Sequence, residues 1–100
     1  MQYEVSYLPL FWEDVHDATN YISDVLMNVK AANNLLDELE ARINVIQNDP
    51  LIALKYRGNS KLDDETYWFS VGNYMAFYVI KENIIEFRRF LYDRRDFGRL

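Results

Sequence analysis

The strongest constraint on the fold lies in the last third of the chain, where three β-prone runs follow one another with only short turns between them. Residues 67–71, 74–80 and 84–92 are rich in aromatic and β-branched side chains. The separating residues, 72–73 (GN) and 81–83 (KEN), are turn sequences. Strands joined by such short turns pair antiparallel. The sequence therefore predicts a three-stranded antiparallel meander.

The first half of the chain follows a different periodicity, with apolar residues every three or four positions. This spacing is typical of amphipathic helices. The second helix ends at Asp49-Pro50, because the residue before a proline avoids helical geometry. Since Asn28 marks the break between the helices, we expect an antiparallel helical hairpin. The expected buried stripes are Trp12, Val15, Thr19, Ile22, Leu26 and Val29, then Ala32, Leu35, Leu36, Leu39, Ile43 and Ile46.

Two remaining segments complete the predicted architecture. Residues 3–8 (YEVSYL) alternate as in a strand that ends before Pro9, and residues 51–66 read as an extended segment and loop. The order is strand, helix, helix and three strands. It predicts an α/β (α+β) fold, a two-layer sandwich in which the hairpin covers one face of a four-stranded sheet. One hundred residues fit one domain, spanning 1–100.

Composition narrows the chemistry. The chain has no cysteine, which excludes disulfides and thiolate metal sites. No catalytic triad, paired carboxylates or glycine-rich phosphate loop stands out, and we expect no metal and no cofactor. The only histidine, His16, is expected to be a half-buried structural residue. With no basic leader and no apolar run long enough for a membrane span, we expect a soluble cytoplasmic protein.

Charge is distributed unevenly. The formal net charge is −5, yet residues 87–100 hold five of the eleven Lys and Arg residues. An acidic balance disfavours a general nucleic-acid binder, while the basic end leaves room for a small anion-binding patch. The alternative is a solvated basic end that neighbouring acidic helices neutralise.

Four stretches of the chain carry a resemblance to a known family. They are residues 14–26 (DVHDATNYISDVL), 31–50 (AANNLLDELEARINVIQNDP), 71–80 (VGNYMAFYVI) and 89–96 (RFLYDRRD). In this order they resemble the RelE/ParE superfamily of toxins from type II toxin–antitoxin (plasmid stabilisation) systems. The resemblance implies a growth inhibitor of the same topology. It also implies a cognate antitoxin whose C-terminal segment wraps and blocks the toxin. Contact with DNA is expected only indirectly, through that antitoxin.

The resemblance leaves three functions open. ParE-like members act on DNA gyrase, and RelE-like members cut mRNA in the ribosomal A site. A third alternative is a non-toxic relative that only binds antitoxin. A RelE-like nuclease needs no metal, because it positions the 2′-hydroxyl to attack the adjacent phosphate. Arginines would stabilise the developing charge and a tyrosine would move protons. Its candidate catalytic residues here are Arg57, Arg89, Arg94, Arg95 and Tyr92.

Three departures favour the ParE-like interpretation over the nuclease. Met75 stands where nucleases of this kind commonly carry a basic residue, the chain ends in Leu100 instead of a catalytic tyrosine, and the net charge is negative. Enzymatic activity is therefore expected only if the chain is RelE-like. The residues predicted to bind the target or the antitoxin are Arg88, Phe90, Tyr92, Arg94, Arg95 and Phe97.

A simpler interpretation exists for two of these arginines. Arg88 or Arg89 pairs with Glu86 or with a helix carboxylate, in which case its role is structural. In a regular strand the two arginines would also point to opposite faces, so only one would line the open face of the sheet.

Overall fold

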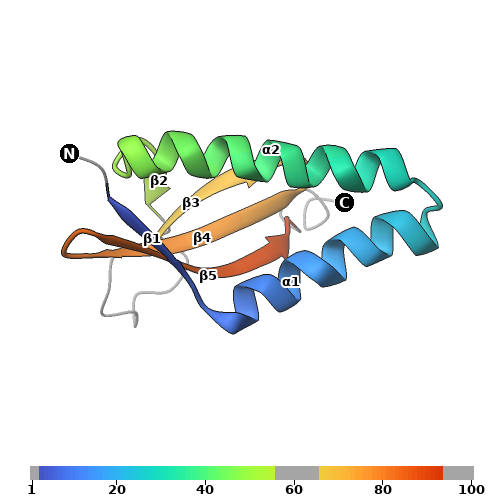
Figure 1. Ribbon diagram of the computed structural model, residues 1–100, viewed down its shortest axis with the longest axis horizontal. Coiled ribbons are helices and arrows are strands. Elements are labelled where there is room, and N and C mark those ends of the chain that lie inside the picture. Colours follow the sequence, from blue (N-terminus) through green and yellow to red (C-terminus); the bar gives the residue numbers. More distant parts are fainter. Residues whose placement is uncertain (1–2, 56–65, 94–100) are drawn as a thin grey trace.

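A five-stranded mixed sheet forms one layer of the structure, a computed structural model that describes residues 3–55 and 66–93 (Figure 1). The strand order is β1-β5-β4-β3-β2. Strand β1 pairs parallel with β5, and the other neighbours pair antiparallel. The bounds are Glu4–Tyr7 for β1, Leu54–Lys55 for β2, Thr66–Val71 for β3, Tyr74–Lys81 for β4 and Ile84–Tyr92 for β5.

The predicted meander is confirmed by the pairing of β3, β4 and β5. Gly72 lies in the turn between β3 and β4 with a φ of +57°, a region that favours glycine. A Cβ at this position would lie 3.4 Å from Cδ1 of Leu35, so the turn also packs closely against a helix. The two-residue strand β2 is the one addition to the four predicted strands, and it lies at the edge of the sheet.

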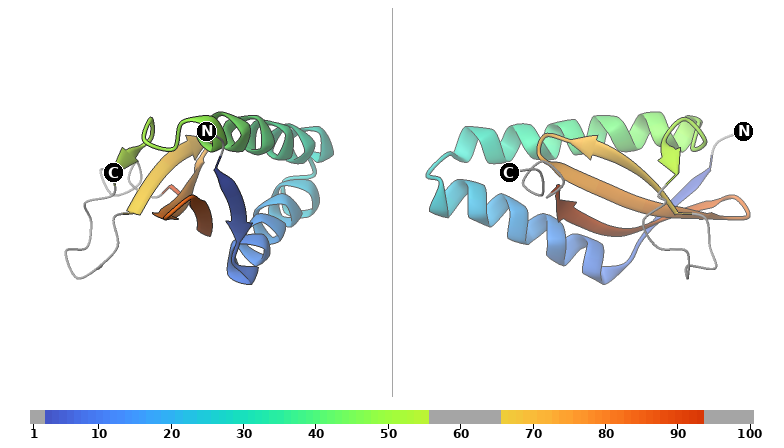
Figure 2. Two further views of the ribbon diagram at one scale, coloured as in Figure 1. Left: turned by 60° about the vertical axis from the view of Figure 1, so that its left-hand side comes forward. Right: turned by 180° about the vertical axis from the view of Figure 1, so that it is seen from behind.

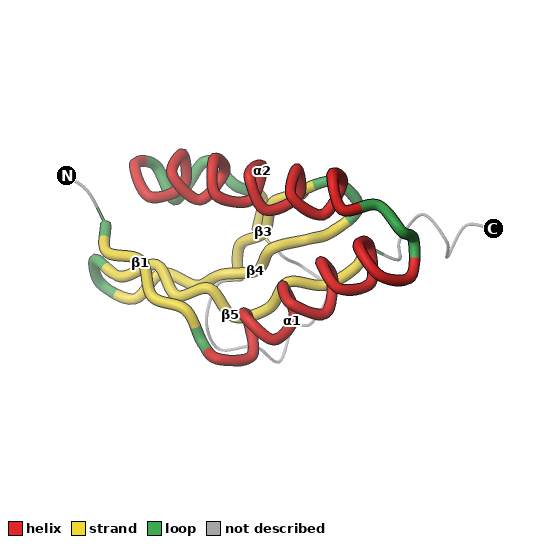
Figure 3. The backbone as a smooth tube through the Cα atoms, turned by 45° about the vertical axis from the view of Figure 1, so that its right-hand side comes forward, coloured by secondary structure: helices red, strands yellow, loops and turns green. Residues whose placement is uncertain are grey.

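Two antiparallel helices form the second layer, as the sequence predicts (Figures 2 and 3). Helix α1 spans Pro9–Asn20 and continues into a π-helical turn at Tyr21–Val25. Helix α2 spans Val29–Asn48, and the side chain of Asn28 caps it by accepting a hydrogen bond from the Ala31 N–H at 3.0 Å. Within the described residues, no helix is both long and apolar enough to cross a membrane.

The core lies between the helices and the sheet. The stripe predicted for α2 is correct except at Leu36, which remains exposed. The stripe predicted for α1 is partly wrong, because Phe11, Val15 and Ala18 are buried whereas Trp12 is exposed. Helix α1 begins with Pro9 in its first turn, where the fixed φ of proline suits a helix. From that start, Phe11 turns toward the sheet and Trp12 falls on the flank of the helix.

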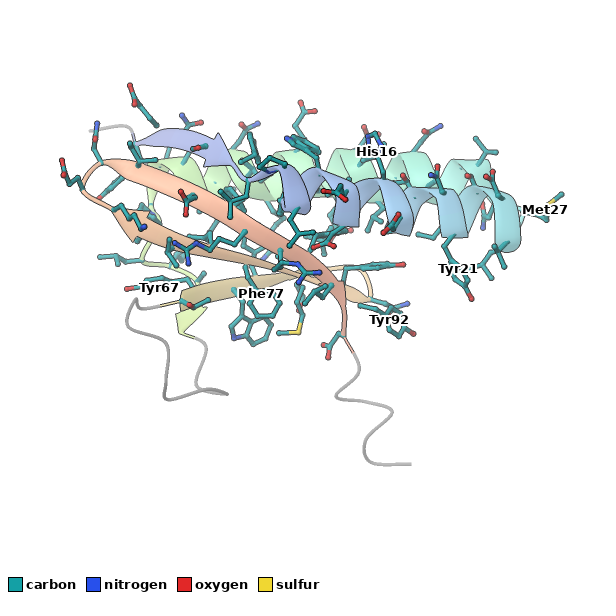
Figure 4. The ribbon with its side chains drawn as sticks, turned by 90° about the horizontal axis from the view of Figure 1, so that it is seen from below. His16, Tyr21, Met27, Tyr67, Phe77 and Tyr92 are labelled. Carbon is teal, nitrogen blue, oxygen red and sulfur yellow. The ribbon has the colours of Figure 1, made fainter. Side chains whose placement is uncertain are left out.

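The far end of the hairpin also departs from the predicted stripe. Leu26 and Val29 are exposed because the hairpin extends past the end of the sheet (Figure 1). His16 is exposed on the outer side of α1, so the half-buried position expected for it is wrong (Figure 4). Among the described residues, no group of three or more His, Cys, Asp or Glu side chains is placed to hold a metal ion.

Tyr78 links the sheet to the segment that follows α2. Its ring is fully buried and stacks on Tyr67 with ring centroids 5.5 Å apart. Its hydroxyl donates a hydrogen bond to the backbone carbonyl of Pro50. Burial, followed by the proximity of Tyr67 and Asp49, raises the pKa of Tyr78 well above its ordinary value.

Replacing Tyr78 by Phe tests this link. The change removes the hydroxyl and leaves the buried Pro50 carbonyl without its donor, so the free energy of unfolding at pH 7 should fall by about 1–2 kcal/mol. Urea unfolding measures this loss. The exposed Tyr21→Phe is the control, with an expected change within about 0.5 kcal/mol; equal losses in the two variants would contradict the assignment.

The stabilities of wild type and Tyr78→Phe can also be compared at alkaline pH. The folded-state pKa of Tyr78 is raised above that of the unfolded chain, so its contribution is complete below the unfolded pKa of about 10 and declines as pH rises further. The stabilities of wild type and Tyr78→Phe should therefore converge above that pH.

Candidate functional site

A β-bulge in β5 sets the positions of the predicted arginines. Phe77 of β4 pairs with Arg89 and Tyr78 pairs with Phe87, so Arg88 is an extra residue in β5. Phe87 is fully buried and Phe90 is 2% exposed, although residues three apart in a regular strand face opposite ways. The expectation that Arg88 and Arg89 point to opposite faces assumes a regular strand. The bulge interrupts the strand between them, so this expectation does not apply.

Helix α1 covers the edge of β5 beyond this bulge. Strand β1 ends at Tyr7, opposite Phe87, and the N–H of Leu8 makes the last backbone bond to the Phe87 carbonyl at 3.0 Å. Past that point, a carboxylate oxygen of Asp14 accepts a hydrogen bond from the backbone N–H of Phe90 at 3.0 Å. A side chain of α1 thus replaces the missing strand.

The same carboxylate binds Arg89. The Nε and Nη2 atoms of Arg89 donate to the two oxygens of Asp14 at 2.7 and 3.1 Å, which is a bidentate pair. The Asp14 side chain is only 9% exposed and that of Arg89 is 42% exposed. The hydrogen bond to Asp14 raises the pKa of Arg89. Arg89 therefore has a structural partner on α1, 75 residues earlier in the chain.

Arg88 is also paired. Its Nε lies 2.8 Å from Oε2 of Glu86, two residues earlier on β5. The interpretation that these arginines pair with Glu86 and a helix carboxylate is therefore correct for both residues. Neither arginine presents an uncompensated positive charge to the sheet surface in this conformation.

Of the other predicted site residues, Phe90 and Tyr92 lie within the described chain, and both line one hollow. Phe90 was predicted to contact a partner, but the structure places it in the core. Its ring packs against Phe11 and Tyr74 instead of facing outward. Tyr92 is exposed at the end of β5 (Figure 4). It lines a hollow of about 230 Å³ together with Asp14 and Asp17. The remaining four, Arg57, Arg94, Arg95 and Phe97, lie outside the described residues.

A larger groove runs between β1 and α2. It has a volume of about 470 Å³ and a mostly apolar lining, with Glu40, Asn44 and Gln47 as its polar members. Trp12 and Leu36, which are 43% and 39% exposed, both line it, although the sequence pattern assigned both to the core. The full lining is Val5, Tyr7, Trp12, Leu36, Leu39, Glu40, Ile43, Asn44 and Gln47.

Tyr7 forms the aromatic side of this groove. Its ring lies 4.9 Å from that of Trp12 and 5.6 Å from those of Phe11 and Phe87. Burial, and then the charge of Glu40, raise the pKa of Tyr7. The groove therefore combines a rigid aromatic wall with a single carboxylate. Sequence analysis missed it, and the available signal is the excess of apolar residues in the two helical stripes.

Comparison with known families decides the identity of the chain. Residues 5–97 match the family described as ParE toxin of type II toxin-antitoxin system, parDE. The chain belongs to the ParE toxin family. A toxin of a type II toxin–antitoxin system is thus the function that the family assigns, and a cognate antitoxin is its partner.

Solved structures show the same fold as this ParE-family toxin. A chain of the chromosomal ParDE system from P. aeruginosa has a TM-score of 0.72 at 11% identity, with 91% of this chain and 96% of that chain covered. The archaeal RelE–RelB complex from Pyrococcus horikoshii OT3 gives 0.66 at 15% identity, with 95% and 99% covered. The E. coli DinJ–YafQ complex gives 0.63 at 16% identity, with 91% and 93% covered. No curated protein sequence matches.

A double-mutant cycle on Asp14 and Arg89 tests the ion pair that joins α1 to β5 in this ParE-family toxin. Asp14→Asn keeps an acceptor for the Phe90 N–H but removes the charge, and Arg89→Gln removes the cation. We expect a coupling free energy of about 1 kcal/mol, because the pair is bidentate but half-exposed. Asp14→Ala should cost more, about 2–3 kcal/mol, because it also leaves the Phe90 N–H unpaired.

Urea unfolding of the four proteins of the cycle gives these values. Asp17→Asn is the matched control, since it neutralises another exposed acid of α1 that does not act on Arg89, and it should change stability by less than about 0.5 kcal/mol. A coupling energy near zero would show that Asp14 and Arg89 do not interact in solution.

Proposed function

We propose that this ParE-family toxin is a cytoplasmic growth inhibitor that acts on DNA gyrase and is silenced by a cognate antitoxin. One observation carries the choice of target: Arg89, the one arginine of the predicted nuclease site that lies within the described residues, is held by Asp14 at 2.7 Å. An arginine neutralised by its own helix is poorly placed to stabilise a phosphate during RNA cleavage.

The surroundings of Tyr92 support the same conclusion. Its hollow is lined by Asp17, whose negative side chain would repel a phosphodiester backbone, and by Asp14, whose charge is compensated by Arg89. Met75, at the position where a nuclease carries a basic residue, is 6% exposed and cannot reach a substrate in this conformation. The net charge of −5 also disfavours binding to ribosomal RNA, whose recognition depends on neutralising phosphates.

A protein target requires only a complementary patch on the toxin. We assign this role, from the sequence, to the basic end of the chain, with Arg94 and Arg95 as the charged contacts and Phe97 as an apolar anchor.

We assign the antitoxin to the groove between β1 and α2. Apolar side chains of the antitoxin segment would cover Trp12 and Leu36, and a lysine or arginine would meet Glu40. The groove volume of about 470 Å³ is large enough for two or three apolar side chains. This assignment explains why apolar residues with helical spacing remain exposed on facing elements.

The choice of target is tested by a supercoiling assay with purified gyrase and toxin. The wild type should block supercoiling, and its induction in cells should stop growth with a DNA-damage response. Arg94→Ala combined with Arg95→Ala should relieve both effects by about tenfold or more while leaving the unfolding midpoint unchanged. Codon-phased cuts in mRNA with normal supercoiling would instead identify a ribosome-dependent nuclease.

The antitoxin site is tested by Leu36→Glu. A carboxylate beside Glu40 in an apolar groove should weaken antitoxin binding by about 2 kcal/mol or more, roughly thirtyfold, because it is left buried and unpaired in the complex. Growth arrest should then persist when the antitoxin is co-expressed. Val45→Glu is the control, because Val45 lies on the same helix and is exposed but does not line the groove. Equal neutralisation of both variants would exclude the groove.

A further inference from the structure

The free end of the helical hairpin carries a second apolar surface, separate from the groove. We name it the hairpin tip. Each of its apolar side chains is at least half exposed, and Met27 at the apex is 82% exposed (Figure 4). These side chains are Tyr21, Val25, Leu26, Met27 and Val29.

Two departures from regular backbone geometry coincide with this patch. Residues Tyr21–Val25 form a π-helical turn, closed by a 3.0 Å bond from the Leu26 N–H to the Tyr21 carbonyl. Met27 follows with a φ of +55°, a left-handed conformation in which glycine or asparagine is favoured over a side chain such as methionine. Strained residues and π-turns occur preferentially at functional sites. The tip thus combines exposed apolar area with a strained backbone that presents it.

We propose that the hairpin tip is the interface through which two copies of this chain associate. The apolar area exposed by its five side chains is about 500 Å² per copy, at the upper end of what monomeric proteins expose as one patch. Two such patches would bury roughly 1,000 Å² in total, near the lower limit of specific interfaces. The expected dimer is therefore weak and reversible.

Charge complementarity favours a second copy as the occupant. The exposed Asp24 lies on the first arm of the tip, and the exposed Lys30 lies on the second arm, one residue after Val29. In a two-fold interface the same patch meets itself, so a contact of Asp24 in one copy with Lys30 in the other would occur twice. The apolar tip would then be flanked by two identical ion pairs.

This interface does not overlap the groove assigned to the antitoxin. Leu39 and Ile43 of α2 line the groove, whereas Val29 begins the same helix at the tip. At 1.5 Å per residue, Leu36, the α2 residue of the groove that is nearest to the tip, lies about 10 Å along the helix from Val29, and none of the tip residues lines the groove. Self-association is thus independent of the proposed function, and its test needs no toxicity measurement.

Sedimentation equilibrium of the full chain tests the proposal, with protein made by cell-free synthesis in the absence of antitoxin. As concentration rises from about 1 to 500 μM, the mean mass should move from the monomer toward the dimer. Met27→Glu should raise the dissociation constant by at least about tenfold. Met27→Gly removes the side chain but suits the left-handed backbone, so it should weaken association while raising the unfolding midpoint.

A charge swap distinguishes a two-fold contact from general stickiness. Asp24→Lys and Lys30→Asp should each weaken association at least about threefold, and the double variant should restore it. Leu51→Asn is the matched control: Leu51 is as exposed as Val25 but lies outside the tip, so association should be unchanged.

A wild type that stays monomeric over this range overturns the proposal. If in that case Met27→Glu also abolishes growth inhibition, the tip binds a different protein. A double charge variant that fails to restore association would likewise exclude the two-fold pairing.

Discussion

The outer edge of β5 is the constraint from which much of this structure follows. Strand β1 accompanies β5 only as far as Phe87, and an uncovered edge beyond that point would leave backbone groups unpaired against the core. Helix α1 lies along this edge, and Asp14 accepts the hydrogen bond from the Phe90 N–H. A largely buried carboxylate in turn requires a cation, which Arg89 supplies. The position of Arg89 therefore follows from the hydrogen bond that the backbone of β5 requires at Phe90.

This origin of Arg89 bears on function, because the superfamily fold carries different activities. A nuclease of this kind needs positive charge that is free to meet phosphate. Here the two arginines of β5 are engaged by Asp14 and Glu86, and the hollow beside Tyr92 holds one further carboxylate, that of Asp17. In the described part of the sheet, the charges of Arg88 and Arg89 therefore stabilise the fold and are not free to bind phosphate. The remaining positive charge of the basic end lies beyond Asp93, in Arg94, Arg95 and Arg99.

Local patterns were sufficient to predict the fold and most of its elements. The turns at residues 72–73 and 81–83 define the meander, and the stripe of α2 identifies its buried face. The stripe of α1 was misjudged, since periodicity gives the repeat of a helix but not which flank the sheet covers. Trp12 and Phe11 are adjacent and both aromatic, and only the start of the helix at Pro9 decides between them.

The candidate site was less predictable, because it depends on contacts between distant residues. The bulge at Arg88 carries no glycine or other local signal, yet it places both Phe87 and Phe90 in the core. Asp14 and Arg89 are 75 residues apart in the sequence, and the residues next to either of them give no signal that the two pair. The roles assigned to Arg57, Arg94, Arg95 and Phe97 stay predictions, since these residues lie outside the described chain.

The exposed apolar surface has a consequence for how such a toxin is controlled. A chain of 100 residues has a modest core and a small stability margin, and this one leaves Trp12 and Leu36 uncovered in the groove. A partner that binds only the folded state adds RT ln(1 + [L]/Kd) to stability, about 4 kcal/mol at a thousandfold excess over Kd. An antitoxin in the groove would therefore protect the toxin from unfolding as well as silence it. Its removal would release an active toxin and shorten its lifetime at the same time.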